Sequence, residues 1–122
     1  MEDPVAAIET LFDALIEQSM ADAEKRGCLL VNTALELPSH KDVVRDLVSS
    51  SLAEIESFFR RMIARAQTRG QVSQDIDPDE TARGLLTLVM GLRVLARGAV
   101  PAGSLDAIKH QAFKLIGDSP HA

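Results

Sequence analysis

An asparagine and a glutamate interrupt an otherwise apolar stretch of this 122-residue chain. The stretch is GCLLVNTALEL at residues 27–37, in which Asn32 and Glu36 lie four positions apart and would share one face of a helix. Buried polar groups without partners cost about 1–3 kcal/mol each, so a bound ligand is one way to satisfy them. The alternative is structural: Asn32 bonds a backbone carbonyl, and Glu36 pairs with an arginine or reaches water near Pro38.

Other residue types capable of chemistry are few and scattered. The single cysteine, Cys28, follows a glycine at the start of an expected helix, where the helix dipole favours a reactive thiolate. A redox or electrophile sensor is one interpretation, and an inert buried side chain is the one we favour. His40, His110 and His121 lie far apart, and no zinc-protease, phosphate-loop or nucleophile-elbow motif is present. We therefore expect no enzyme activity, no metal and no cofactor.

The composition is typical of a folded globular chain and excludes several classes of protein. Hydrophobic residues make up 46% and charged residues 25%, and the length fits one domain over residues 1–122. The apolar runs are far shorter than the ~20 residues that cross a bilayer, so we expect no membrane partner. A net charge of −5 with scattered basic residues predicts no direct nucleic-acid contact. A single cysteine suits the cytoplasm.

Helical periodicity and capping residues predict an all-α domain of five helices without strands. Asp3-Pro4 and Asp77-Pro78 each combine an N-cap side chain with a proline suited to the first helical turn. Pro38 ends the second helix, and Gly70 closes the third, whose last turns are rich in arginine. The expected helices span about residues 4–26, 28–37, 40–69, 78–98 and 104–116.

Short motifs follow one another along these helices in a recognisable order: GCL at 27–29, AQTRG at 66–70, DP at 77–78 and GLRVLAR at 91–97. In this order they resemble the C-terminal domain of TetR/AcrR-type bacterial transcriptional regulators, over nearly the whole chain. Family members also carry an N-terminal helix-turn-helix domain, which is absent from this sequence. Either the chain is a fragment of a longer regulator, which we favour, or it is a stand-alone relative.

The resemblance implies an effector pocket walled by the first four helices. The residues expected to line it are Phe12, Ile16, Asn32, Glu36, Val48, Leu52, Ile55, Phe59, Met62, Leu86 and Met90. For each apolar residue among them, plain core packing is the commoner role. The chain has no Trp or Tyr, so a ligand is expected to be small or aliphatic rather than a large planar cation.

The resemblance also implies a homodimer, in which the last two helices of each subunit form an intersubunit four-helix bundle. The residues expected at that interface are Thr87, Leu88, Gly91, Leu92, Leu95, Ile108, Ala112 and Leu115. The alternative is that these side chains only fill the core of a monomer. Closed two-fold dimers are the commonest oligomers, which favours the first interpretation.

The resulting hypothesis is an effector-sensing and dimerisation domain of a TetR-like repressor. A small molecule that prefers one arrangement of the first helices would change DNA binding through the absent domain. Two alternatives stay open: a purely structural dimerisation module with a filled interior, and a stand-alone helical carrier of a small apolar ligand. A cavity of about 300–1,000 Å³ between the helices would favour sensing.

Overall fold

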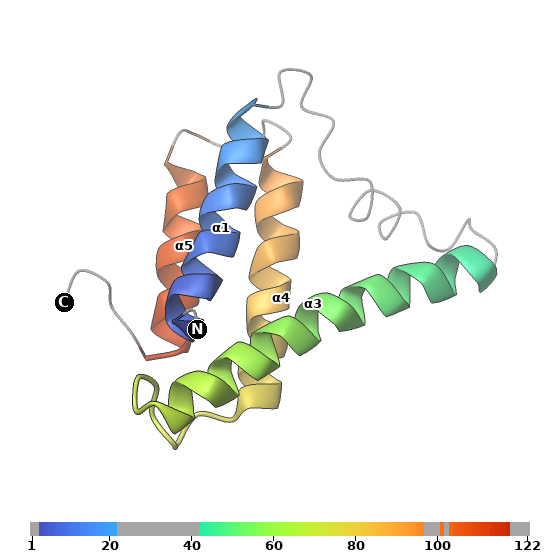
Figure 1. Ribbon diagram of the computed structural model, residues 1–122. Helices are drawn as coiled ribbons and strands as arrows, with labels where there is room; N and C mark the ends of the chain where they lie inside the picture. The colour runs from blue at the N-terminus through green and yellow to red at the C-terminus, as the bar shows by residue number, and fades with distance from the viewer. Residues whose placement is uncertain (1–2, 22–41, 97–100, 102, 118–122) are drawn as a thin grey trace.

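The protein is described by a computed structural model for residues 3–21, 42–96, 101 and 103–117. These residues form the helices α1 (Pro4–Ala21), α3 (Asp42–Thr68), α4 (Pro78–Leu95) and α5 (Ser104–Leu115). In Figure 1, α1, α4 and α5 stand side by side, and α3 runs across them. The expected all-α architecture is confirmed for this part of the chain. The expected helix at 28–37 lies outside the described residues, so the five-helix count stays a prediction.

Both Asp-Pro pairs open helices, as the sequence predicts. The Asp3 carboxylate accepts hydrogen bonds from the backbone N–H groups of Val5 at 2.9 Å and Ala6 at 3.3 Å. The Asp77 carboxylate accepts one from the backbone N–H of Asp79 at 3.0 Å. Each cap satisfies N–H groups that have no partner within the first helical turn.

The hydrophobic core lies where all four described helices meet. Phe12 of α1 packs against Phe59 of α3 with ring centroids 6.0 Å apart, and both side chains are fully buried. The other fully buried large residues come from every described helix or its end: Pro4, Ile8, Ile63, Leu85, Leu92, Phe113 and Ile116. Burial of aromatic and aliphatic side chains at this density is the main stabilising contribution, about 1.5–3 kcal/mol for each large side chain.

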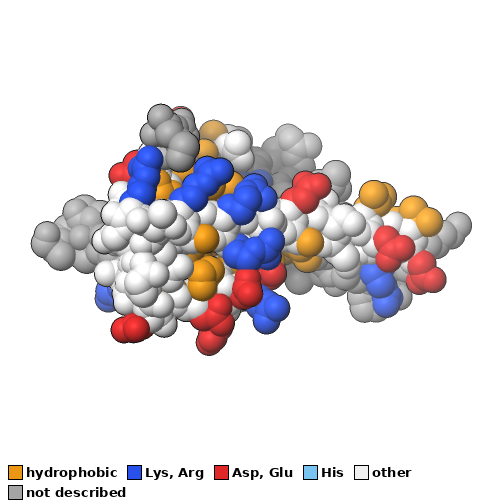
Figure 2. Space-filling view, turned by 60° about the horizontal axis from the view of Figure 1, so that its bottom comes forward, with side chains coloured by type: hydrophobic (Ala, Val, Ile, Leu, Met, Phe, Trp, Pro, Cys, Tyr) orange, Lys and Arg blue, Asp and Glu red, His pale blue; other side chains and the backbone are white. Residues whose placement is uncertain are grey.

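The longest of these helices, α3, is divided between two environments. Most of its buried residues, Phe59, Met62, Ile63 and Ala66, lie in its C-terminal half. Its N-terminal half extends beyond α1, α4 and α5 (Figure 1) and carries the exposed Val43 and Leu47. Figure 2, which looks at the molecule from the α3 side, shows Lys and Arg side chains gathered over one part of this surface. Toward the other end, hydrophobic side chains lie beside acidic ones.

The connection from α3 to α4 explains the AQTRG motif. The backbone N–H of Gly70 bonds the carbonyl of Gln67 at 3.0 Å, and the N–H of Gln71 bonds that of Ala66 at 2.8 Å. This is a Schellman C-cap, and Gly70 adopts the left-handed φ of 75° that the motif needs. The Gln67 side-chain amide then donates to the carbonyl oxygens of Ser73 at 3.0 Å and Ile76 at 2.7 Å.

Two of the polar links between α1 and its surroundings involve carboxylates of α1 and of its cap. Lys109 of α5 contacts the carboxylates of Asp13 at 2.6 Å and Glu9 at 3.9 Å. The Gln71 side-chain amide donates to the Asp3 carboxylate at 2.9 Å. That bond, together with those from the Ala6 and Val5 N–H groups, lowers the pKa of the Asp3 carboxyl below its ordinary value of 3.8.

None of the helices in the described segments combines the length and the apolar character needed to cross a membrane.

Substitution Gln67→Ala tests the role of the amide in the α3–α4 connection. It removes the donor to the Ile76 carbonyl and one of the two donors to the Ser73 carbonyl, which keeps the Ile76 N–H at 3.3 Å. We therefore expect the free energy of unfolding to fall by about 1–3 kcal/mol. The measurement is urea unfolding followed by circular dichroism. The control is Gln18→Ala, an exposed position on α1. Equal, small effects of both substitutions would contradict a structural role for Gln67.

Substitution Asp3→Asn isolates the charge of the first cap, because asparagine caps helices as well as aspartate does. The lowered pKa of Asp3 means that its carboxylate stabilises the fold above about pH 4, and that this contribution is lost as pH falls below the ordinary value of 3.8. We therefore expect the wild type to lose more stability than Asp3→Asn in this acidic range. Thermal unfolding of both proteins across that range measures the difference, and parallel curves would contradict the assignment.

Candidate functional site

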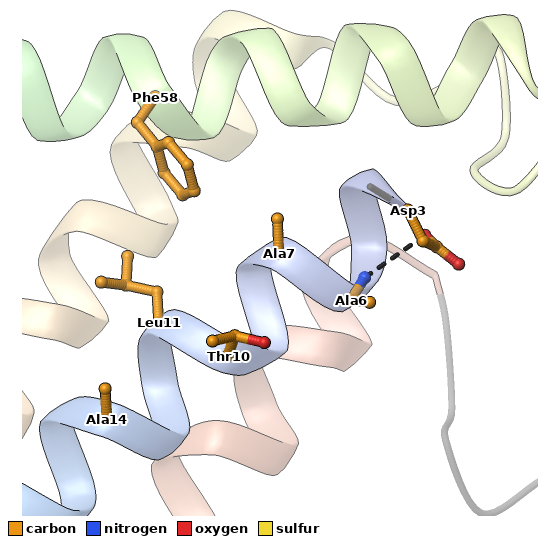
Figure 3. A pocket seen from close by; sticks show the side chains of 7 residues that line it. All are labelled: Asp3, Ala6, Ala7, Thr10, Leu11, Ala14 and Phe58. Atoms are coloured by element: carbon orange, nitrogen blue, oxygen red, sulfur yellow. Dashed lines mark hydrogen bonds between the residues drawn. The ribbon is translucent and has the colours of Figure 1, made fainter. Parts of the chain in front are cut away.

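A hollow of about 530 Å³ lies between α1 and α3. Its lining comes mostly from one side of α1, with one aromatic side chain from α3. The lining residues are Asp3, Ala6, Ala7, Thr10, Leu11, Ala14 and Phe58. In Figure 3 the Phe58 ring points from α3 toward α1, across from Leu11 and Ala7. The space exists because most α1 side chains on this side are alanine or threonine and do not reach α3.

The lining is mainly apolar, with polar groups from Thr10 and Asp3. The Asp3 carboxylate at the start of α1 is anionic at neutral pH, and it already accepts hydrogen bonds from Val5, Ala6 and Gln71. An occupant would therefore meet aliphatic and aromatic carbon, the Thr10 hydroxyl and one negative charge. Within the described segments, no three His, Cys, Asp or Glu side chains are grouped so that they could hold a metal ion.

The described residues among those predicted to line the effector pocket lie away from the hollow. Asn32 and Glu36 are outside the described residues. Phe12, Ile16, Phe59 and Met62 are buried members of the common core, as is expected of plain packing residues. Val48 is buried, and four more are partly buried: Leu52, Ile55, Leu86 and Met90. None of these nine described residues borders the hollow between α1 and α3, and the role of the whole predicted set in ligand binding stays a prediction.

The prediction selected bulky apolar side chains, whereas the hollow is bordered by small ones. Ala6, Thr10 and Ala14 recur every fourth residue along α1, on a different side of the helix from Phe12. Bulky side chains fill the space into which they point, and small ones leave space open. A repeat of small residues beside an apolar stripe was the signal in the sequence that could have located this hollow.

A partly buried arginine at the contact of α4 with α1 is a second polar feature that the prediction missed. Arg93 donates from Nη1 to the Ser19 hydroxyl at 3.2 Å, and Ser19 is buried. The Nε atom of Arg93 is also buried, yet no acceptor for it is found in the described structure. Leu86 and Met90 precede Arg93 at helical spacing on α4 and are likewise partly buried. A hydrogen-bond acceptor placed here would satisfy a donor whose burial is otherwise unfavourable.

The predicted dimer residues divide into two groups. Leu92 and Ala112 are enclosed by the core of their own chain, at 0% and 1% exposure, and their place at an interface stays a prediction. The other six keep some exposure: Thr87, Leu88, Gly91, Leu95, Ile108 and Leu115. We call these six residues the α4–α5 outer face.

Two glycines on α4 have different surroundings. A Cβ atom at Gly84 would come within 3.1 Å of the Leu115 side chain, so a glycine here lets α5 approach closely. A Cβ atom at Gly91 would meet no atom of the described residues within 4 Å. The glycine at position 91 therefore serves no close approach between the described helices, and it leaves open space on the α4–α5 outer face.

A model of the family described as "Tetracyclin repressor-like, C-terminal domain" matches residues 4–108. This range includes α1, α3 and α4 in full and the beginning of α5. Neither curated proteins nor solved structures give a significant match. TetR-like C-terminal domains are regulatory rather than catalytic, and they generally dimerise and bind small effectors. The match covers most of the chain and confirms the resemblance noted in its sequence, so the chain belongs to the family of tetracyclin repressor-like C-terminal domains.

Proposed function

We propose that this chain is the effector-sensing and dimerisation domain of a TetR-like transcriptional repressor. The observation that carries the proposal is the family match over residues 4–108. The α4–α5 outer face supports the dimerisation part of this proposal, and the hollow between α1 and α3 supports the effector-sensing part. DNA binding belongs to a separate helix-turn-helix domain.

The α4–α5 outer face supports dimerisation. It combines partly exposed aliphatic side chains with the open site at Gly91, where a helix of a second subunit can approach closely. Leu115 is the most exposed large hydrophobic residue of α5, at 45%. Two such helix pairs related by a two-fold axis would form a four-helix bundle and remove this surface from water.

The hollow supports binding of a small, largely apolar effector. Its volume of about 530 Å³ falls within the range of roughly 300–1,000 Å³ that is common for small-molecule sites. Phe58 and Leu11 offer apolar contacts, and the Thr10 hydroxyl can orient a polar group. The buried Nε of Arg93 lies at a separate α1–α4 contact, where an effector with a carbonyl or carboxylate oxygen would find a donor.

Helix α1 offers a physical connection between the two sites. Ala6, Thr10 and Ala14 border the hollow, while Asp13 on another side of α1 contacts Lys109 of α5. An effector that binds one position of α1 relative to α3 better than another shifts the population toward that position. Lys109 then carries the shift to α5 and so to the α4–α5 outer face, which is the coupling that a sensor requires.

A purely structural dimerisation module is the second candidate function. The observation that favours it is the close packing of the buried side chains of Phe12 and Phe59, which fill this part of the described core. In that case the hollow would be an open surface feature without a ligand.

Substitution Gly91→Arg tests the proposed dimer interface. A Cβ atom is accommodated at this position within the chain, so the arginine should leave the monomer folded while its length and charge exclude a partner helix. We expect the dimer dissociation constant to rise by roughly a hundredfold or more, because a buried unpaired charge costs several kcal/mol. Sedimentation velocity over a concentration series measures this, and circular dichroism checks folding.

The matched control is Gln18→Arg, which adds the same charge at an exposed position on α1. If Gly91→Arg and Gln18→Arg dimerise equally well, the α4–α5 outer face is not the interface.

Substitution Ala14→Phe tests the hollow, because a benzyl group there takes up part of the space between α1 and α3. The probe is the uncharged N-phenyl-1-naphthylamine, whose fluorescence rises in apolar sites, with displacement by decanol as a second readout. We expect Ala14→Phe to weaken probe binding roughly tenfold or more, since even one displaced apolar contact surface costs over 1 kcal/mol. Ala107→Phe, an exposed alanine on α5, is the control. Unchanged binding in Ala14→Phe would favour the structural module.

A further inference from the structure

One face of α3 points away from the bundle along the whole helix. At 100° per residue, these positions fall within one sector of the helix, and the side chains are exposed. They are Val43, Asp46, Leu47, Ser50, Glu54, Arg61, Ala64, Arg65 and Thr68. We call this set the α3 outer face. It is separate from the α4–α5 outer face, because the ion pairs Arg60–Asp79 and Glu56–Arg83 join a different side of α3 to α4.

The two halves of the α3 outer face are chemically opposite. The N-terminal half is acidic and carries two prominent hydrophobic side chains, Val43 at 69% and Leu47 at 64% exposure. The C-terminal half carries Arg61 and Arg65 with the small side chains Ala64 and Thr68 between and after them. In Figure 2 most basic side chains gather over one part of this side of the molecule, next to some acidic ones, and hydrophobic side chains lie among both acidic and basic ones toward the other end.

The helix dipole accounts for only part of this arrangement. Acidic residues near a helix start and basic residues near its end are favourable, but the effect falls off within the first and last turns. Arg65 lies in the last turn of α3, where the dipole favours it, whereas Glu54 lies near the middle of the helix and Arg61 about two turns before its end. The dipole has no bearing on Val43 and Leu47, which are uncharged and exposed.

The α3 outer face is complementary to itself when two copies run antiparallel. In one such register Asp46 of each copy faces Arg65 of the other, and Leu47 faces Ala64. In the same register Val43 lies opposite Thr68. Large apolar side chains thus meet small ones, and opposite charges meet twice through the two-fold symmetry. We propose that the α3 outer face binds the α3 outer face of a second copy of this chain, antiparallel and about a two-fold axis.

The shape of the molecule permits this contact. The N-terminal half of α3 extends beyond α1, α4 and α5 (Figure 1), so these three helices do not cover that half of the α3 outer face. The proposal goes beyond the function proposed above, since it adds a second two-fold interface to the one on α4 and α5. Together, two such interfaces on each chain join dimers into larger assemblies. Exposed charge pairs are individually weak and are screened by salt, so this association is weaker at high ionic strength.

Charge reversal at the proposed pair tests the contact. Asp46→Arg and Arg65→Glu each place like charges opposite one another at both symmetric positions, so each should weaken self-association roughly tenfold or more. The double variant Asp46→Arg/Arg65→Glu restores opposite charges. An equimolar mixture of the two single variants does so too. In a mixed pair, the two substituted positions carry opposite charges and face each other, and Asp46 of one chain faces Arg65 of the other. Both should return to within roughly threefold of the wild-type affinity.

Sedimentation velocity over a concentration series measures these affinities in the wild-type background and in Gly91→Arg. In the Gly91→Arg background, association through α3 is observed without the α4–α5 interface, so failure of one interface is distinguished from failure of the other. Arg45→Glu is the matched control. It makes the same change of charge as Arg65→Glu at an exposed position on the opposite side of α3, and it should leave association unchanged.

Two results would overturn the proposal. One is self-association that does not respond to the single reversals, or that the double variant and the mixture fail to restore. The other is wild-type binding to a labelled DNA duplex that Arg65→Glu abolishes while self-association is unaffected. That second result would make the basic half of α3 a nucleic-acid surface instead.

Discussion

The contact between Phe12 of α1 and Phe59 of α3 determines how the rest of the described structure is arranged. The two rings are 6.0 Å apart and fully buried, so the position of α1 against α3 is set by close packing at this point. The next ring, Phe58, lies edge-on to Phe59 at 5.6 Å and is thereby turned toward the hollow. The same contact that fills the core therefore also determines which aromatic side chain borders the hollow.

Much of the fold depends on local interactions that can be predicted from neighbouring residues in the sequence. The Asp-Pro openings of α1 and α4 and the glycine after α3 act through backbone hydrogen bonds made by near neighbours, and all three were predicted correctly. Expected helix ends differ by a few residues, as where α4 ends at Leu95 rather than near Gly98. The double hydrogen bond of the Gln67 amide was not foreseen, because its acceptors lie in an irregular segment whose path the sequence does not specify.

The candidate sites were harder to predict, because they depend on what side chains leave empty and on which helices meet. Periodicity identifies the face of a helix that is buried, but not whether another element covers the face beside it. Leu92 and Ala112 match the pattern expected of an interface and are buried in the core of their own chain. Ala6 and Thr10 border the hollow, although no role was predicted for them from the sequence. Arg93 was noted only as part of a motif, since its buried Nε becomes apparent only when α4 lies against Ser19 of α1.

Different sides of helix α1 make different contacts. One side of α1 supplies Phe12 to the core, a second borders the hollow, and a third carries Asp13 to Lys109 of α5. A rigid helix that takes part in three contacts cannot move at one without changing the others, which is the physical requirement for linking a ligand site to a distant surface. In α3 the division runs along the helix instead: its C-terminal half is held by the core, and its N-terminal half presents apolar side chains to solvent. Leu47 is 64% exposed in the single chain, so burying it against a partner would remove apolar surface from water.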